Sequence, residues 1–478
     1  MAAPNNLLSK EFITQLIDAV GERSVLTKAA DLERFLIEER GLYQGEAPIV
    51  IVPDNTEALA RAVSVCAKAG VSMVPQGGNT GLVGGSVTSA DQVLVSLSRL
   101  NRIREIDPTN FTITVEAGVV LAQVQEAAKA AGCFFPLSLG AEGSCTIGGN
   151  IASNAGGVGV LRYGNTRELT LGVEVVLPDG QIWNGMRPVL KDNSGYSLKN
   201  LFIGSEGSLG IVTAAILKLF PQLRQIETAF CALDSVESAL ALLALARQRS
   251  GDMVSAFELI SDFSLGVVTD YLKYQSPVST SAPWYVLVEL STSREGNELR
   301  GLFETILEEA FEKNLIQDAL IASSLDQSDK LWKLRETMNE AQKHIGGSIK
   351  HDISVPISRM PEFIKIARIA VEDYMPGIRL SAFGHVGDGN VHYNFVQPAG
   401  MDKNAFLAKT HEVNDIVHTI AVQMRGSMSA EHGIGLLKVE DVFHRRSKVE
   451  NHMMQAIKNV IDPHNLMNPG KVILMEKV

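Results

Sequence analysis

Two histidines lie seven residues apart around three glycines in the stretch GHVGDGNVH, residues 384–392. On a helix this spacing would place both rings on one face, but the glycines make a helix unfavourable. An Asp-Gly pair between apolar segments predicts a hairpin, with Asp388 and Gly389 at its turn. His385 would then lie opposite His392, and opposed residues share a face with Cβ atoms roughly 5 Å apart.

Two imidazoles at that distance can bind one metal ion. The same spacing also fits a glycine-rich turn whose two histidines only form hydrogen bonds. The spacing alone does not decide between a metal site and a structural turn, so the rest of the chain has to be considered.

The composition is that of a globular chain with room for several domains: 478 residues, 45% hydrophobic and 20% charged. The net charge of −11 and the absence of a long basic run argue against a nucleic-acid partner. Four dispersed cysteines indicate buried thiols rather than disulfides. No signal-peptide pattern and no membrane-spanning run is present, so we expect a cytoplasmic (bacterial) protein with no transmembrane segment, and leave a peripheral membrane contact open.

Helix and strand patterns alternate in the first half of the chain. Helices are predicted at residues 7–20, 57–70 and 119–131. Strands are predicted at 48–53, 71–75, 93–97 and, as a pair, near 102–116; a hairpin at 170–183 turns at Asp179-Gly180, and a strand follows the turn at 202–210.

The sequence changes character after Pro221, where glycine becomes sparse and strands alternate with long helices. This pattern predicts an α+β domain built on an antiparallel sheet. We expect three parts: an N-terminal domain at 1–222, an inserted domain at 223–425, and a C-terminal segment at 426–478 that rejoins the first domain.

Three glycine-dense stretches, 77–85, 140–159 and 204–210, all precede the inserted domain. Such loops let several backbone N–H groups converge on an anion. The first contains no Walker A pattern, and a Rossmann fingerprint is poorly supported. One such loop would fit a cluster of structural turns, whereas three favour a large ligand with a diphosphate.

These stretches, PQGGNTGLVGGS, LGAEGSCTIGGNIASNAGG and IGSEGSLGI, resemble the FAD-binding (PCMH-like) domain of the vanillyl-alcohol-oxidase-like flavoproteins. The motifs LWKLRE, KHDISVP, GHVGDGNVH, SAEHGIG and NPGK are similar to the FAD-dependent D-2-hydroxyacid dehydrogenases, nearest to the D-2-hydroxyglutarate branch. The resemblance covers nearly the whole chain. It implies a vanillyl-alcohol-oxidase-type FAD domain with an inserted α+β substrate (cap) domain.

The resemblance assigns cofactor contacts to residues in each stretch. In the first stretch these are Pro75, Gly77, Gly78, Asn79, Thr80, Gly81, Leu82 and Ser86. In the second they are Gly140, Gly143, Ser144, Thr146, Gly148, Gly149, Asn154 and Gly157. The remainder are Glu206, Gly207, Gly210, Ile211, Asn390 and Asn468. Some relatives tether FAD to a histidine where this chain has Asn79, so we expect noncovalent FAD.

The resemblance also answers the question of the two histidines. It implies that His385, His392 and Glu431 bind a divalent metal, usually zinc, and that His432 is the general base. Two imidazoles and a carboxylate leave a coordination position for substrate. Asp388 could orient a ligand or serve only as a turn residue.

Further substrate contacts are implied at Arg335, Asn339, Lys350 and Asn394. By its helical position Arg335 alone would be a solvated flank, and Lys350 would lie on a wet strand face. In the family the matching arginine and lysine hold the distal carboxylate of a dicarboxylic acid, which favours D-2-hydroxyglutarate or D-malate. Members of the branch carry threonine where this chain has Asn339, which leaves the chain length of the acid open.

The predicted reaction is oxidation of a D-2-hydroxy acid with hydride transfer to the FAD N5. The alternatives are a D-lactate or glycolate-type dehydrogenase, a zinc hydrolase, and an inactive flavin-binding scaffold. Reoxidation requires an acceptor, for which an electron-transfer flavoprotein or a quinone is expected, and we expect a homodimer.

Overall fold

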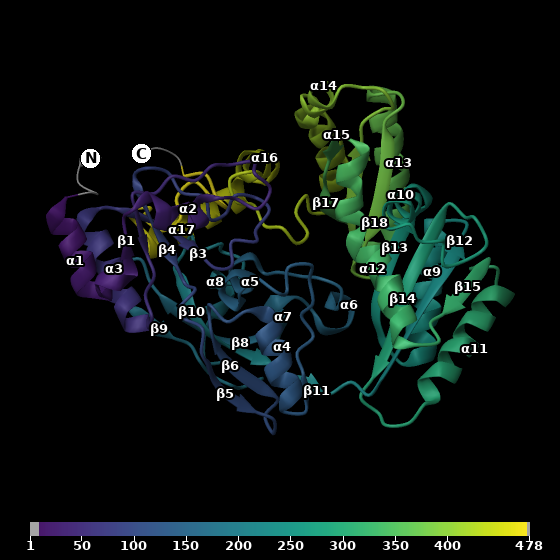
Figure 1. Ribbon diagram of the computed structural model, residues 1–478, viewed down its shortest axis with the longest axis horizontal. Helices are drawn as coiled ribbons and strands as arrows, with labels where there is room; N and C mark the ends of the chain where they lie inside the picture. The colour runs from purple at the N-terminus through teal and green to yellow at the C-terminus, as the bar shows by residue number, and fades with distance from the viewer. Residues whose placement is uncertain (1–8, 476–478) are drawn as a thin grey trace. The chain divides into compact units, whose positions relative to one another are not determined.

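The computed structural model describes residues 9–475, which form two compact units (Figure 1). The first combines residues up to Gly156, Gly164–Gln222, and the residues from Glu431 onward. The second combines Gly157–Tyr163 with Leu223–Ala430.

All four cysteines are buried and unbridged, as expected. Among the described residues, no helix is both long enough and apolar enough to cross a bilayer.

The first unit begins with a four-stranded sheet in the order β1-β2-β4-β3, in which β2, β4 and β3 are parallel. Helices α1 and α3 pack on it through a core of small and branched apolar side chains. The bounds are β1 Val25–Leu26, β2 Ile49–Ile51, β3 Ser72–Gln76, β4 Gln92–Ser96, α1 Lys10–Val20, α2 Ala29–Leu36 and α3 Thr56–Ala69. Asn55 caps the start of α3, and Gly70 ends it in the left-handed conformation.

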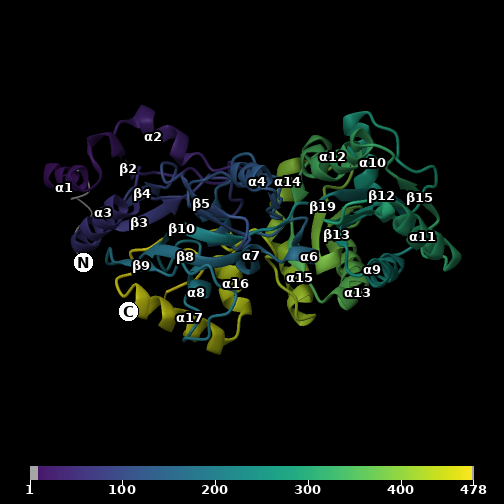
Figure 2. The same ribbon diagram turned by 90° about the horizontal axis from the view of Figure 1, so that it is seen from below.

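A five-stranded antiparallel sheet follows in the order β5-β6-β10-β8-β9, and β7 pairs with β11. Strands β5, β10, β8 and β9 of this sheet are labelled in Figure 2. Its bounds are β5 Ile103–Asp107, β6 Thr112–Glu116, β8 Thr170–Val176, β9 Ile182–Asn184 and β10 Ile211–Lys218, with β7 Cys133–Phe134 and β11 Phe220–Pro221. The helices between them are α4 Leu121–Ala130, α5 Ile147–Ser153, α6 Val160–Tyr163, α7 Thr166–Leu169 and α8 Lys199–Phe202; α6 belongs to the second unit.

The C-terminal segment returns to the first sheet, as the sequence predicted. Met73 of β3 donates its N–H to the carbonyl of Leu466 and accepts from the N–H of Asn468. The two helices before this segment are α16 Val439–Arg445 and α17 Lys448–Ile461. Lys458 of α17 is buried and donates to the carbonyls of Ser208 and Met467.

The second unit is one large antiparallel sheet, as predicted, in the order β15-β12-β14-β13-β18-β19-β16, with β17 also paired to β19. The strands are β12 Gln225–Leu233, β13 Val254–Ser261, β14 Trp284–Thr292, β15 Asp318–Ile321, β16 Ser348–Ile349, β17 Asp352–Ser354, β18 Arg379–Gly384 and β19 Asn390–Val396. The helices are α9 Val236–Ser250, α10 Asp262–Leu272, α11 Glu298–Glu312, α12 Leu325–Gln342, α13 Met360–Tyr374, α14 Lys403–Leu407 and α15 Thr410–Gln423.

Helices cover both faces of this sheet. Helices α10 and α12 pack on one face, over a core that contains Phe230, Ile260, Leu287 and Phe383. Helices α9 and α11 pack against the strands from the other side, and α13 contacts the same side through Tyr393, whose hydroxyl donates to the carbonyl of Ile364. A charged side chain that points toward α12 from the sheet is therefore enclosed.

Candidate active site

The first and second glycine stretches of the first unit pack closely against each other. The first stretch forms the loop between β3 and β4, and the second surrounds α5. A Cβ atom added at Gly78 would lie 2.3 Å from the carbonyl oxygen of Ser144, and one at Gly77 would lie 2.5 Å from Thr146 Oγ1. Side chains are therefore excluded here for steric reasons, and backbone groups line the junction.

Several buried polar atoms beside these loops have no hydrogen-bond partner among the described residues. They are Thr146 Oγ1, Asn150 Nδ2 and Asn468 Oδ1. A buried polar atom left unpaired is costly, so such atoms indicate a ligand or water. Together with the glycine junction they fit a polar cofactor such as FAD. Asn150 was not among the residues predicted from the sequence.

Asn79 and Asn154 both adopt the left-handed conformation, with φ of 58° and 52°. Asn79 Nδ2 donates to the carbonyl of Ile37, and its Oδ1 accepts from Ser86. Asn154 ends α5, and its Oδ1 accepts from the N–H of Arg167. Both side chains hold the shape of their loops. The remaining predicted positions of these two loops are Thr80, Gly81, Leu82, Gly140, Gly143, Gly148, Gly149 and Gly157.

The third stretch forms the turn before β10, where Gly207 fits against Pro75 and Gly210 precedes Ile211. Glu206, with φ of 49°, directs its carboxylate at the SAEHGIG segment. It accepts from the N–H groups of Ile434 and Gly435 at 2.6 and 2.9 Å. Burial raises the pKa of Glu206, although these two N–H groups act against the rise.

Asn468 links the same turn to the first loop, because its Nδ2 donates to the carbonyls of Gly85 and Glu206. The segment after His432 also contacts the first loop: Leu436 and Leu437 donate their N–H groups to the carbonyl of Val83. A Cβ atom at Gly435 would lie 2.2 Å from that carbonyl oxygen. The residues that follow His432 are thus fixed to the glycine loops of the first unit.

The predicted hairpin forms, but its predicted register is wrong. Strand β18 pairs with β19 so that Phe383, not His385, lies opposite His392. Five residues connect the strands instead of two, because Val386–Asp388 form a 3-10 turn that closes at Gly389 with φ of 89°. The two imidazoles nevertheless lie close, with ring centroids 5.7 Å apart.

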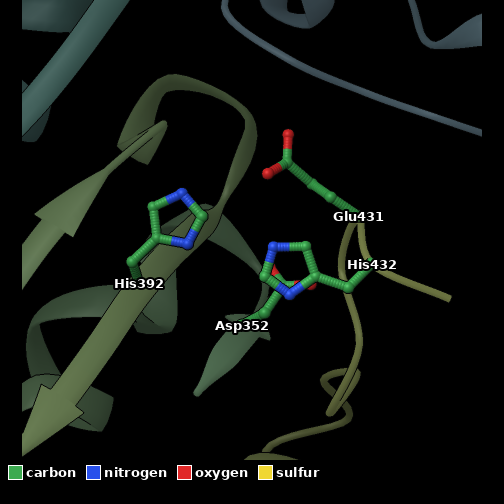
Figure 3. A group of neighbouring side chains, drawn as sticks. All are labelled: Asp352, His392, Glu431 and His432. Atoms are coloured by element: carbon green, nitrogen blue, oxygen red, sulfur yellow. The ribbon is translucent and has the colours of Figure 1, made fainter. Parts of the chain in front are cut away.

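Four potential metal ligands gather near the start of β19 (Figure 3): Asp352, His392, Glu431 and His432. Each offers one ligand atom, and these atoms lie within 4.8 Å of one another. Asp352 is paired with His392 in the sheet, and the N–H of Ala430, just before Glu431, donates to the Asp352 carbonyl. His392 and Glu431 were predicted ligands, whereas Asp352 was not. Among the described residues, His385 is not a member of this group.

His385 instead contacts a carboxylate that the sequence analysis missed. Its Nδ1 lies 2.7 Å from Glu258 Oε1, and Arg335 Nε donates to Glu258 Oε2 at 2.7 Å. The Glu258 side chain has no exposed surface. Burial acts to raise its pKa, but the opposing effects of His385 and Arg335 are larger together and lower it to about 2.

Arg335 is therefore not the solvated flank that its helical position suggested, since only 7% of the residue is exposed. Its guanidinium carbon lies 5.1 Å from the centroid of the Phe383 ring. Asn339, one turn further along α12, is exposed.

The strand face expected around Lys350 is also not wet. The predicted strand is interrupted between β16 and β17. Asp352 is buried, and Lys350 is half-buried. Asn390 Nδ2 donates to Asp352 Oδ1. Asn394 Oδ1 accepts from the N–H of His351, and its Nδ2 donates to Gln342 Oε1. Asp388 accepts from the N–H of Asn390, and burial raises its pKa to about 6 despite His385. Asn390 belongs to the second unit and contacts Asp352 of the ligand group. Its predicted cofactor contact stays a prediction.

Both missed carboxylates left a signal in the sequence. Glu258 is the only charged residue of β13, VSAFELIS, and charged residues are rarely enclosed unless paired. Asp352 is the only acidic residue of HDISVP and precedes the apolar Ile353. A single acidic residue in a mostly apolar strand therefore indicates a candidate site residue.

Two family models match the chain. One, described as FAD binding domain, matches residues 47–185, and the other, described as FAD linked oxidases, C-terminal domain, matches residues 222–472. Among solved structures, p-cresol methylhydroxylase with substrate bound has a TM-score of 0.75 at 16% identity, covering 96% of both chains. An alkyldihydroxyacetonephosphate synthase has a TM-score of 0.73 at 17% identity, covering 97% of this chain and 86% of the other. The fold is thus the expected vanillyl-alcohol-oxidase type.

Curated relatives match over nearly the full length. D-2-hydroxyglutarate dehydrogenase of Xanthomonas citri pv. viticola is 36% identical, covering 96% of both chains. The mitochondrial D-2-hydroxyglutarate dehydrogenase of Arabidopsis thaliana is 35% identical, covering 98% of this chain and 82% of the relative. A Schizosaccharomyces pombe relative whose name assigns it to D-lactate is 35% identical, covering 94% and 86%. The chain belongs to the family of FAD-linked oxidases that includes these hydroxyacid dehydrogenases.

These matches confirm the expectation of an FAD-dependent hydroxyacid dehydrogenase. They also confirm FAD as the cofactor class.

Proposed function

We propose that the chain oxidises a D-2-hydroxy acid to the 2-oxo acid, with D-2-hydroxyglutarate favoured and D-malate next. The observation that carries the proposal is the grouping of His392, Glu431 and His432, three residues from two separate motifs, around one point. The names of the relatives, 35–36% identical over nearly the whole chain, support the substrate class.

The donor set fits a divalent metal, for which we propose zinc. His392 and Glu431 of the ligand group would hold it together with His385, whose ring centroid lies 5.7 Å from that of His392. Asp352 lies in the same group and accepts from Asn390 Nδ2. Imidazole and carboxylate ligands suit zinc, and fewer than four protein ligands leave a position for substrate. When bound, such an ion supplies positive charge that polarises the α-hydroxyl and lowers its pKa.

The glycine loops would hold FAD noncovalently, with Asn79 where some relatives have a tethering histidine. When bound, FAD supplies the two-electron acceptor, its N5, for the hydride that leaves the substrate Cα. The residues that follow His432 are fixed to these loops through Glu206 and Val83. This attachment supports a position for His432 close to the loops that would hold FAD.

His432 would act as general base. A ring nitrogen of the imidazole would take the hydroxyl proton as the hydride leaves. The acid thus loses one proton and one hydride and becomes the 2-oxo acid. Asp352 offers an oxygen within 4.8 Å of a His432 ring nitrogen.

Arg335 and Lys350 would bind the distal carboxylate of the acid, with Asn339 and Asn394 as further contacts. A guanidinium has five N–H groups, and the bond to Glu258 uses only the Nε–H. Bidentate pairing with a carboxylate suits the others.

The test is anaerobic reduction of the bound flavin by a panel of D- and L-hydroxy acids. We expect D-2-hydroxyglutarate to bleach the flavin absorbance fastest and L-acids to leave it unchanged. D-lactate is the second candidate, favoured by the Schizosaccharomyces pombe relative. Faster bleaching by D-lactate would move the assignment to that substrate. A flavin that no acid bleaches would identify a scaffold, and a protein that cannot be loaded with FAD would overturn the proposal.

Metal removal provides a second test. Chelation should abolish most activity and leave FAD bound, because the proposed metal ligands are distinct from the glycine loops. Zinc or manganese should restore turnover, and His392→Ala should resemble the chelated protein. Full turnover by a protein shown to be metal-free would remove the metal from the mechanism.

We further propose a homodimer whose flavin is reoxidised by an electron-transfer flavoprotein or a quinone, and a cytoplasmic location. Light scattering tests the dimer, and turnover with each acceptor class tests the electron route.

A further inference from the structure

Glu258 lies at the meeting point of two site residues because of the strand register. Strands β13 and β18 pair Leu259 with Gly384 and Ile260 with Phe383. Continuing this antiparallel register by one residue places Glu258 opposite His385. Helix α12 covers the same face, and its Arg335 reaches the same carboxylate.

This carboxylate determines which nitrogen of His385 is available. An ionised carboxylate only accepts hydrogen bonds, so the Nδ1 atom 2.7 Å from it must carry the hydrogen. The neutral ring then has its lone pair on Nε2. A metal ion binds the nitrogen that has no hydrogen, and a carboxylate on the other nitrogen fixes the ring for that role.

The same carboxylate also fixes Arg335. Its second oxygen accepts from Arg335 Nε at 2.7 Å, and the guanidinium lies near the Phe383 ring. The Glu258 carboxylate thus contacts the guanidinium of Arg335 with one oxygen and the His385 ring with the other.

We infer that Glu258 is a positioning residue for the site: by bonding His385 Nδ1 it presents Nε2 to the metal, while it holds Arg335 for the substrate carboxylate. The inference rests on the proposed function for the identity of the metal site. It goes further by making the binding of metal depend on a side chain that touches neither metal nor substrate.

A matched control is present on the same sheet. Glu289 of β14 is also an enclosed acid, and it accepts from Ser255 Oγ at 2.7 Å and from Trp332 Nε1 at 3.1 Å. Neither partner is a proposed ligand. Burial raises the pKa of Glu289. A change at Glu289 therefore disturbs the sheet to a similar extent without altering the His385 hydrogen bond.

The experiment compares Glu258→Gln with Glu289→Gln in the FAD-loaded protein. A glutamine that keeps its oxygen on Arg335 turns its NH2 group toward His385, which favours the hydrogen on Nε2 instead. Competition with a chromophoric chelator then measures zinc affinity. We expect about 10–100-fold weaker binding in Glu258→Gln and wild-type affinity in Glu289→Gln. Equal affinity in the Glu258 variant, or an equal loss in both variants, would overturn the inference.

Histidine-selective ¹⁵N NMR of the metal-free protein gives an independent readout, with the His385 signals assigned through His385→Ala. We expect the hydrogen on Nδ1 in wild type and on Nε2 in Glu258→Gln. Hydrogen on Nε2 in wild type would overturn the inference even if the variant does not fold. A wild type that binds no zinc, or whose flavin no hydroxy acid reduces, would instead count against the proposed function, which separates the two failures.

Discussion

Two glutamates, one in each unit, hold site residues by different means. Glu258 in the sheet of the second unit bonds two side chains, Arg335 and His385, and its pKa is lowered to about 2. Glu206 in the first unit bonds the backbone N–H groups of Ile434 and Gly435, and burial raises its pKa. A carboxylate with a charged partner remains ionised when enclosed, whereas one held by neutral N–H groups is easier to protonate. The first arrangement fixes side-chain orientation, and the second fixes the path of the chain.

Removing the carboxylate at 258 should have the largest effect on stability. Glu258→Leu leaves the guanidinium of Arg335 enclosed without its partner, and breaking one side of a buried ion pair costs about 3–5 kcal/mol. We expect the free energy of unfolding to fall by this amount in urea titrations that follow the second unit. The double variant Glu258→Leu/Arg335→Met removes both charges and should recover much of the loss. A double variant no more stable than the single one would contradict a charge-based explanation.

Glu206→Ala should have a smaller effect on stability. It leaves two backbone donors without acceptors, at a cost of about 1–3 kcal/mol. Hydrogen exchange at Ile434 and Gly435 should accelerate, and turnover should fall because His432 lies only two residues before Ile434. Glu206→Gln keeps one oxygen acceptor and should lie between wild type and alanine. Unchanged exchange in the alanine variant would show that the segment is held by Val83 alone.

The smallest effect should be a pH dependence confined to the first unit. Burial lowers the pKa of Lys471 to about 8, although Glu206 acts to raise it. Above pH 8 the folded amine has lost its proton while the unfolded amine still holds one, so stability rises with pH. Between pH 8 and 9 the gain is about 1 kcal/mol.

Lys471→Met should remove that gain, which unfolding measurements at the two pH values would show. The Glu258→Leu variant serves as the control and should keep it. An unchanged slope in Lys471→Met would assign the pH dependence to another group.

The sequence was sufficient for many of the regular elements and for two members of the ligand group, His392 and Glu431. The helix ending at Gly70, the strands of the first sheet and the antiparallel second domain follow from periodicity and capping residues, which are local properties. The glycine stretches identified loops that pack on each other in the first unit, and GHVGDGNVH identified the hairpin of the second unit that carries His392. The hairpin register was wrong because Asp388-Gly389 also fits the end of a longer turn, and the turn length is set by packing.

Partners brought together by tertiary structure could not be predicted. Glu258 and Arg335 are 77 residues apart, and nothing in either local pattern shows that one neutralises the other. Without that pairing, Arg335 could only be placed by its helical position, which suggested solvent. Asp352 was missed for the same reason, since its position in the site depends on pairing with His392.

The path of the chain also has a consequence for biosynthesis. The first unit draws β3 from near the start of the chain and completes that edge with Leu466–Asn468, near its end. On the ribosome this sheet edge must wait until almost the whole chain has been synthesised. The second unit takes nearly all its residues from Leu223–Ala430, so its sheet can form while the ribosome is still adding the residues that finish the first.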